Sequence, residues 1–281
     1  MNVRNFGLAA AAVVALSALA GAAGAQSISI KGSDTMLPLG QAWAAGYMKA
    51  KGGSTVTVTG GGSTTGIAAL INGSCDIAQA SRSVKGSEVE SAKGRGFVPF
   101  EVPAARDGLA IIVNPANPIA KLSIPQLRAI YSGAAKSWKD VGGQNVGIIT
   151  VGRDSSSGTY GFFQDSVLGV GRPYRADMQT SPSTNAIAQV VAQDAGAIGY
   201  VGIAYAAKFA GKVKVISISR APNAPAIEPS KANVLNGKYP LWRYLFFYTR
   251  GRASGAAKAF IDWVRSPAGQ GLVEEVGYYS L

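Results

Sequence analysis

Three short loops rich in Gly, Ser and Thr are the parts of this sequence best suited to chemistry. They are Gly32-Ser33-Asp34-Thr35, Gly61-Gly62-Ser63-Thr64-Thr65-Gly66 and Arg153-Asp154-Ser155-Ser156-Ser157-Gly158-Thr159. Each follows an extended apolar run and precedes a helical pattern, so each sets the unpaired N–H groups of a helix N-terminus beside hydroxyl donors. Three such loops converging on one point would offer a small tetrahedral oxyanion hydrogen bonds from several directions.

Each loop also has a purely structural interpretation. Ser and Thr before a helix are ordinary N-caps, and a glycine-rich turn is ordinary where the chain reverses. For a single loop this interpretation is the favoured one. Three such loops in one chain, one of them carrying Arg153, favour an anion site instead.

Composition argues against most catalytic mechanisms. The 281 residues include no His and a single Cys, Cys75. The commonest general base and any His-ligated metal are therefore missing, and Cys75 can form no intramolecular disulfide. We find no GxSxG elbow and no GxxxxGK[ST] loop. We expect no catalytic residue, no metal and no cofactor, and we expect Cys75 to be a small buried hydrophobe.

The chain is basic, with 27 Lys and Arg residues against 15 Asp and Glu and a net charge of +12. Without Arg4 in the expected signal peptide, 26 minus 15 leaves +11. A nucleic-acid or polyanion binder is one interpretation of this charge. The basic residues are scattered, however, without a basic run or helix face. An electrostatic field that favours small anions is therefore the preferred interpretation, with no nucleic-acid partner.

The N-terminus is typical of a secretory signal peptide over residues 1–25. Arg4 precedes an uninterrupted apolar stretch at 8–20, and Ala23-Gly24-Ala25 forms a small-x-small cleavage site. The stretch is shorter than the roughly 20 residues that a membrane span requires, and no Cys stands at the cleavage site to carry a lipid. We expect a mature chain of 281 minus 25, or 256 residues, that is periplasmic and not inserted in the membrane.

The remaining chain alternates short β-branched or apolar runs with amphipathic segments, which predicts an α/β fold. Strands are expected at 28–31, 56–59, 76–80, 98–113, 146–151, 197–201, 213–218 and 241–249. Helices are expected at 35–48, 65–71, 124–131 after a capping box at Ser123, 159–168, and 255–276 with a break at Pro267. Trp43, Tyr47 and Trp138 are expected to pack in the core.

Together, these motifs resemble the periplasmic phosphate-binding proteins of ABC-type uptake systems, in the type II solute-binding protein family. The resemblance is carried by Gly-Ser-Asp-Thr-Met at 32–36, the glycine-rich loop at 60–66, Asp76-Ile77-Ala78 with Ala80-Ser81-Arg82, and Arg153 with Ser157-Gly158-Thr159. The segments 122–143 and 239–278 look similar as well. The resemblance therefore covers essentially the whole mature chain.

The resemblance implies a two-lobed periplasmic binding protein fold, in which each lobe is a mixed sheet flanked by helices. Lobe 1 would comprise 26–110 and 246–281, and lobe 2 would comprise 111–245, with crossover hinge strands near 109–113 and 244–249. It also implies a monomer that binds inorganic phosphate between the lobes, closes on it, and delivers it to the transmembrane subunits of an ABC permease. Matching the motifs position by position implies this set of phosphate-binding residues: Ser33, Thr35, Met36, Ser63, Ser81, Arg82, Asp107, Arg153, Ser157, Gly158 and Thr159.

The sequence departs from the family pattern at Arg82, where the best-known members carry Asp, and at Asp107, where they carry Gly. A buried carboxylate can accept the proton of phosphate, yet it repels fully ionised sulfate. We therefore expect Asp107 to take this role, with Arg82 balancing its charge. The alternative is a structural pairing of Asp107 with Arg106 or Arg82. Asp154, displaced by one position from a family aspartate, is expected to pair with Arg153.

Three other functions remain open from the sequence. A receptor for sulfate, molybdate or tungstate would use the same kind of site. A phosphatase is disfavoured because His is missing. A surface polyanion binder or adhesin would depend on the net charge alone.

Overall fold

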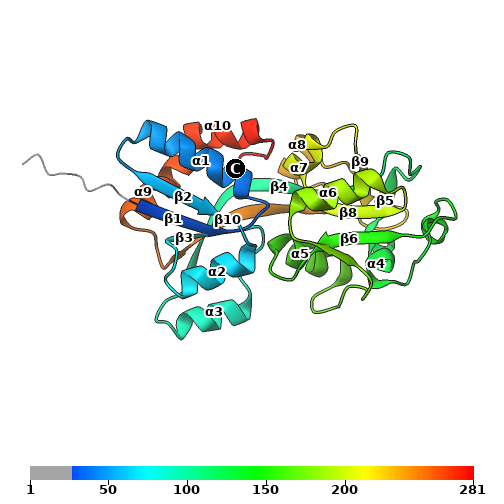
Figure 1. Cartoon of the computed structure of the whole chain (residues 1–281), viewed down its shortest axis with the longest axis horizontal. Helices are drawn as coiled ribbons and strands as arrows, with labels where there is room; N and C mark the ends of the chain where they lie inside the picture. Colours follow the sequence, from blue (N-terminus) through cyan, green and yellow to red (C-terminus); the bar gives the residue numbers. More distant parts are fainter. Residues whose placement is uncertain (1–26) are drawn as a thin grey trace, which may run out of the picture.

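The structure is a computed structural model that describes residues 27–281. The expected signal peptide, residues 1–25, lies outside the described residues. The described chain folds into two α/β lobes that lie side by side and are connected by long strands (Figure 1). Within residues 27–281, no helix combines the length and the apolar character needed to cross a bilayer.

Lobe 1 contains the first and last parts of the described chain. Its strands are β1 (Ser27–Gly32), β2 (Thr55–Thr59), β3 (Ile77–Ala80), the first part of β4 (Pro99–Val113) and β10 (Trp242–Arg250). Its helices are α1 (Leu37–Ala50), α2 (Ser63–Ile71), α3 (Gly86–Lys93), α9 (Gly255–Arg265) and α10 (Pro267–Val276). The strand order is β2-β1-β3-β10-β4, with β1 parallel to β2 and β3, and β10 antiparallel to both its neighbours.

Lobe 2 is formed by the middle of the chain. Its strands are the last part of β4, β5 (Lys121–Ser123), β6 (Ile149–Arg153), β7 (Gln179–Ser181), β8 (Ala197–Gly202) and β9 (Lys214–Ser219). Its helices are α4 (Ile124–Ser132), η1 (Trp138–Val141), α5 (Gly158–Phe163), η2 (Gln164–Leu168), α6 (Thr184–Gln193), α7 (Ile203–Lys208) and α8 (Lys231–Leu235). β4 lies between β8 and β9, and β6 and β7 extend the sheet beyond β8.

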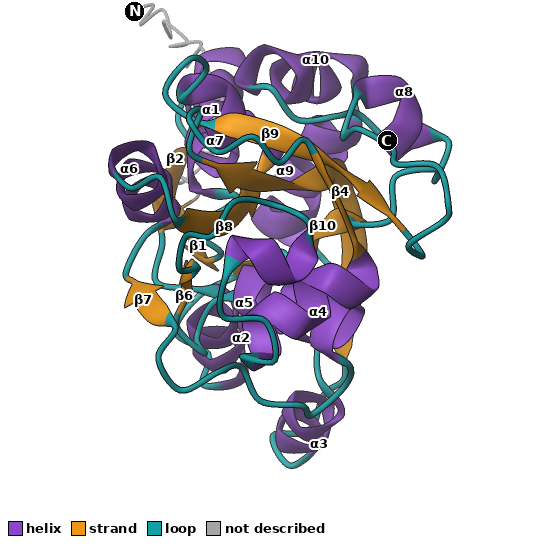
Figure 2. Ribbon diagram, turned by 90° about the vertical axis from the view of Figure 1, so that its right-hand side faces the viewer, coloured by secondary structure: helices purple, strands orange, loops and turns teal. Residues whose placement is uncertain are grey.

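Apolar side chains fill both faces of each half of the sheet. In lobe 1, one core joins α1, α9 and α10 to the strands, and a smaller core lies under α2. In lobe 2, α4 and α5 cover one face, while α6 and α7 cover the other (Figure 2). This layering leaves the ends of the strands, where the loops lie, free to face the other lobe.

Strand β4 belongs to both lobes. Its residues from Pro99 to Gly108 pair with β10, and those from Leu109 onward pair with β8. The chain changes partners at the boundary between Gly108 and Leu109. β10 pairs with β4 along its whole length, so the returning chain reaches lobe 1 by Trp242, somewhat before the predicted second crossover at 244–249.

Several local predictions are confirmed. The long extended stretch is β4, the capping box at Ser123 begins α4, and α9 and α10 are separated at Ser266 before Pro267. Trp43, Tyr47, Trp138 and Cys75 are buried as expected. The helix predicted from residue 35 begins at Leu37 instead, because the Met36 N–H first closes a turn on the Ser33 carbonyl at 3.1 Å.

Candidate anion-binding site

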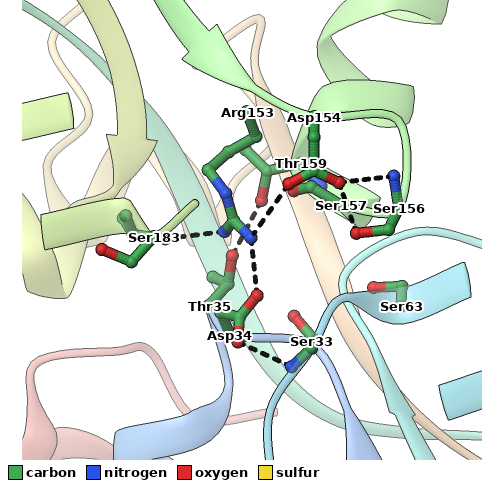
Figure 3. Close-up of polar contacts among 12 residues, drawn as sticks. Ser33, Asp34, Thr35, Ser63, Arg153, Asp154, Ser156, Ser157, Thr159 and Ser183 are labelled. Carbon is green, nitrogen blue, oxygen red and sulfur yellow. Dashed lines mark hydrogen bonds and ion pairs between the residues drawn. The ribbon is translucent and has the colours of Figure 1, made fainter. Parts of the chain in front are cut away.

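The three loops identified from the sequence meet between the lobes, as predicted. The first loop (residues 33–36) joins β1 to α1, the second (60–62) joins β2 to α2, and the third (154–157) joins β6 to α5. Gly61 N–H donates to Asp34 Oδ1 at 2.8 Å, and Thr64 N–H donates to the Ser156 carbonyl at 3.0 Å. The second loop is therefore bonded to the first loop, and the first turn of α2, which follows the second loop, is bonded to the third. Figure 3 shows side chains of the third loop facing those of the first.

Glycine is required where the loops approach most closely. Gly62 has a φ of +93°, and a Cβ at this position would lie 2.5 Å from the Ser156 carbonyl oxygen. A Cβ at Gly158 would lie 2.2 Å from Ser63 Oγ and 2.7 Å from Ser81 Oγ. A larger residue at either position would push the lobes apart, so both glycines are needed for this close approach.

Four buried hydroxyl groups form a chain across the gap, which we call the hydroxyl cluster. Its members are Thr35, Ser63 and Ser81 from lobe 1, and Thr159 from lobe 2. Thr35 Oγ1 lies 2.7 Å from Thr159 Oγ1, while Ser81 Oγ lies 3.5 Å from both Thr159 Oγ1 and Ser63 Oγ. Each of the four residues is 2% exposed or less. Such a group of small donors, excluded from water, is well suited to a desolvated oxyanion.

Beside the cluster lies an arginine–carboxylate pair, which we call the outer pair, Asp34 with Arg153. Arg153 Nη2 donates to Asp34 Oδ2 at 2.6 Å, and the pair joins lobe 2 to lobe 1. The Asp34 side chain is 18% exposed, whereas that of Arg153 is 2% exposed. Among the described residues, Arg153 Nε has no hydrogen-bond partner. The guanidinium therefore keeps one buried donor available.

A chain of three tyrosines is hydrogen-bonded to the backbone of Arg153. The Arg153 N–H donates to the Tyr200 hydroxyl at 3.4 Å, and the Tyr200 hydroxyl donates to the Tyr174 hydroxyl at 3.3 Å. Tyr174 in turn donates to the carbonyl of Tyr160, in the first turn of α5, at 2.8 Å. Because this chain returns to α5, it holds the strand that carries Arg153 against the helix that carries Thr159.

On the other side of the cluster lies a second pair, the inner pair, Asp107 with Arg243. Arg243 Nε and Nη2 donate to Asp107 Oδ2 at 3.0 and 2.8 Å, and the Ile203 N–H donates to Asp107 Oδ1 at 3.1 Å. Burial raises the pKa of Asp107 above its ordinary value, while the Arg243 guanidinium and the Ile203 N–H oppose this rise. Arg243 Nη2 also donates to Thr159 Oγ1 at 3.0 Å. The inner pair is thus bonded directly to the hydroxyl cluster.

Most of the predicted site residues lie around the cluster. Ser33 is buried beside it and donates from its N–H to the Gln79 carbonyl at 2.8 Å. Ser157 caps α5 by accepting the N–H groups of Thr159 and Tyr160. Ser63, Ser81 and Thr35 contribute the hydroxyls described above. The structure thus assembles one polar site from residues far apart in the sequence.

For Met36, the backbone N–H is the group predicted to donate at the first loop. It lies in that loop and donates to the Ser33 carbonyl at 3.1 Å, while the Met36 side chain is buried in the apolar core of lobe 1. Arg82 was expected to balance Asp107, and this expectation is wrong. Arg82 instead pairs with Glu88 at 2.7 Å and donates to Thr64 Oγ1 at 2.9 Å, since it leaves β3 on the side of α2 and α3. The alternative partner of Asp107, Arg106, donates to the Leu235 carbonyl.

Sequence reasoning missed Arg243 and the role of Asp34. Asp154 does lie near Arg153, but at 4.0 Å, so Asp34 at 2.6 Å is the closer partner. The one available signal for Arg243 was a charge inside the otherwise apolar run at 241–249. Its pairing with Asp107 depends on the register of β10 against β4, in which the two residues stand directly opposite each other.

Comparison with known proteins shows which family this chain resembles. The model of a PBP superfamily domain matches residues 17–268. The phosphate-binding protein PstS of Bacillus subtilis is 33% identical over 253 residues, which are 90% of this chain and 80% of that protein. PstS of Pseudomonas aeruginosa is 32% identical over 272 residues, covering 91% of this chain and 83% of that protein.

Two solved structures are similar along their whole length. A substrate-binding protein assigned to a phosphate ABC transporter of Clostridium perfringens, with phosphate bound, has a TM-score of 0.81 and 28% identity. It is matched over 91% of this chain and 100% of its own. An ABC-type phosphate transport receptor from Vibrio cholerae has a TM-score of 0.75 and 30% identity, over 90% of this chain and 100% of its own.

Proposed function

This chain belongs to the phosphate-binding proteins of the PBP superfamily, and we propose that it captures inorganic phosphate between its lobes and delivers it to an ABC importer. The observation that carries the proposal is the buried hydroxyl cluster, which draws donors from both lobes and lies between two arginines. The role is binding rather than catalysis, as in the relatives described above.

The proposed phosphate contacts come from opposite directions. Thr35, Ser63 and Ser81 donate hydroxyl protons from lobe 1, while Thr159 and the Arg153 guanidinium donate from lobe 2. Ser33, Ser157 and Gly158 line the same place. Because Arg153 adds a full positive charge to its hydrogen bond with the anion, whereas the hydroxyl donors are neutral, it is the dominant contact of this set.

Selectivity for phosphate over sulfate requires a group that only accepts hydrogen bonds, and Asp107 is the proposed acceptor. A Cβ at Gly202 would lie 3.1 Å from Thr35 Cγ2 and 3.3 Å from both carboxylate oxygens of Asp107. The carboxylate is therefore close behind Thr35. Its Oδ1 receives the Ile203 N–H, so a lone pair remains to accept a proton from phosphate.

The remaining proposals concern movement and location. We place the hinges at 108–109 in β4 and at 239–242, where the chain enters β10, close to the ends of the proposed lobes at 110 and 245. The signal peptide at 1–25, a periplasmic location, a monomeric state and the transmembrane permease partner follow from the sequence pattern and from the family.

Calorimetry tests the proposed ligand directly. Protein purified under denaturing conditions, refolded without phosphate, is titrated separately with phosphate, sulfate and molybdate. We expect phosphate to bind tightly, and the other two anions to bind at least tenfold more weakly, a difference of about 1.4 kcal/mol or more. Tighter binding of sulfate or molybdate would assign the site to a different oxyanion.

A further inference from the structure

Arg243 contacts both lobes at the edge of the hydroxyl cluster. Its Nη1 donates to the Ser81 carbonyl of lobe 1 at 3.0 Å, and its Nη2 donates to Thr159 Oγ1 of lobe 2 at 3.0 Å. Nε and Nη2 together hold Asp107. The guanidinium lies 5.2 Å from the ring centroid of Phe162, which packs against it. Every nitrogen of this side chain therefore has a fixed partner.

These bonds restrict the directions that hydroxyl protons can take in the cluster. A guanidinium has no acceptor, so Thr159 Oγ1 must accept from Arg243 and can only donate its proton elsewhere. At the other end of the cluster, Ser63 Oγ accepts the Ser81 N–H at 3.1 Å. Ser63 must therefore also direct its proton elsewhere.

The four hydroxyl groups of the cluster carry more protons than the contacts among them can use. The four hydroxyls of the cluster carry four protons, while three contacts join them to one another. A contact uses one proton, so at least one proton must point out of the cluster. Two of the three contacts are long, at 3.5 Å, and they compete weakly with a charged acceptor.

We propose that Arg243 is a positioning residue of the anion site: held by Asp107, it donates to Thr159 Oγ1 and so turns the cluster's protons toward the bound anion. This inference rests on the proposed function. With that donation, one of the two lone pairs of Thr159 Oγ1 is occupied and at most one can accept from Thr35 or Ser81. Without it, both lone pairs are unoccupied and either can face the anion. Because Ser81 and Thr159 belong to different lobes, Arg243 completes this arrangement only when the lobes meet.

Lysine cannot replace this arginine. The planar guanidinium reaches a carboxylate, a carbonyl and a hydroxyl at once in a fixed geometry, whereas an ammonium is a single point on a flexible stem. Arg243→Lys keeps the positive charge opposite Asp107 while losing part of this set. The variant therefore separates the direction of the hydroxyl protons from the charge of the site.

A double-mutant cycle tests the inference. Phosphate affinity is measured by calorimetry for the wild type, Arg243→Lys, Thr159→Val, and the variant that carries both changes. We expect Arg243→Lys alone to weaken binding about tenfold or more, because hydrogen bonds from charged groups are among the stronger ones. In the Thr159→Val background, the same change should alter the affinity by about twofold or less, because the hydroxyl it acts through is gone.

Arg106→Lys is the matched control, because Arg106 lies on the adjacent strand β4 and its Nη1 bonds only the Leu235 carbonyl. It should leave phosphate affinity unchanged. If Arg243→Lys fails to fold, Arg243→Gln, whose amide keeps a hydrogen-bond donor and leaves Asp107 unchanged, enters the same cycle with Thr159→Val. Equal losses in both backgrounds would overturn the inference while leaving the proposed function standing. Failure of the wild type to bind phosphate would overturn both.

Discussion

The two arginine–carboxylate pairs flanking the hydroxyl cluster differ in their surroundings. The outer pair, Asp34 with Arg153, joins the lobes, and its carboxylate is 18% exposed. The inner pair, Asp107 with Arg243, links neighbouring strands, and its side chains are 0% and 3% exposed. Asp34 receives one backbone N–H and one guanidinium contact, whereas Asp107 receives three donors.

This difference in surroundings implies different roles for Arg153 and Arg243. Arg153 has a free Nε and a partner that water can reach, so it can exchange part of its bonding for an anion at modest cost. Arg243 is fully bonded, and separating it from Asp107 would leave a charge without a partner in a dry interior. The Arg153 guanidinium is therefore suited to binding and releasing the anion, whereas the Arg243 guanidinium is suited to holding Asp107, the proposed acceptor, in a fixed position.

The largest expected difference between the pairs is in stability. Asp107→Leu leaves Arg243 buried and unpaired, which we expect to cost about 3–5 kcal/mol and to lower the melting temperature by roughly 10 °C. Asp34→Ala should cost about 1 kcal/mol, because its pair is partly hydrated. Thermal unfolding of phosphate-free samples, followed by circular dichroism, measures both.

The double variant Asp107→Leu/Arg243→Met provides the control. Replacing a whole buried pair by apolar side chains is often neutral or stabilising, so the double variant should recover most of the loss. If Asp107→Leu melts like the wild type, the inner pair does not hold this region together, and the contrast between the pairs fails.

The next largest effect is on phosphate affinity. Arg153→Ala should weaken binding by about 2–5 kcal/mol, enough to abolish a measurable signal, because a buried anion loses its charged donor. Arg220→Ala is the matched control, since it removes the same charge from an exposed position in lobe 2. Calorimetry with phosphate reports both variants. Unchanged affinity in Arg153→Ala, with a normal circular dichroism spectrum, would remove Arg153 from the site.

The two pairs also differ in how far the sequence could predict them. Arg153 stands in a local pattern of strand, Ser-rich loop and helix, so its position near an anion site could be read from adjacent residues. Arg243 and Asp107 are separated by 136 positions, and only the pairing of β10 with β4 brings them together. A one-residue change in that register would turn the two side chains to opposite faces of the sheet.

Arg82 shows that sequence reasoning can also miss a pair whose residues are close together in the chain. The two departures from the family pattern, at Arg82 and Asp107, led us to expect that these residues balance each other's charge, although Glu88 lies only six positions after Arg82. The short turn into α3 makes Glu88 the closer carboxylate, and the resulting bonds also join Lys85 N–H to Glu88 Oε2 at 2.7 Å. The sequence shows that Glu88 carries the opposite charge to Arg82 and is close to it along the chain. It does not show in which direction the Arg82 side chain points after β3.

A smaller effect concerns the choice between anions. Phosphate near neutral pH carries at least one proton and sulfate carries none, while both are tetrahedral, so an acceptor-only group can separate them. Asp107→Asn adds donors and removes the repulsion of sulfate. We expect the ratio of sulfate to phosphate affinity to rise by about tenfold or more, or 1.4 kcal/mol. Competition titrations with both anions measure this ratio.

Asp34→Asn serves as the comparison for that ratio. It makes the same chemical change in the outer pair, where we expect the ratio to stay near its wild-type value. If the ratio instead rises in Asp34→Asn and stays constant in Asp107→Asn, the discriminating carboxylate belongs to the outer pair, and the assignment of the two pairs is reversed.

The smallest expected effect is on the shape of the anion-free protein. We expect phosphate to close the lobes about the hinges at 108–109 and 239–242, so small-angle scattering should give a smaller radius of gyration with phosphate than without it.

The outer pair is the charged contact that joins the first and third loops across the gap. A partly exposed ion pair contributes up to about 1 kcal/mol, which alters the ratio of closed to open molecules about fivefold. Asp34→Asn should therefore enlarge the radius of gyration of the phosphate-free sample alone, because bound phosphate holds Arg153 in the saturated one. An equal enlargement in both samples would show that Asp34 shapes lobe 1 itself, and identical radii with and without phosphate would show that the site is preformed.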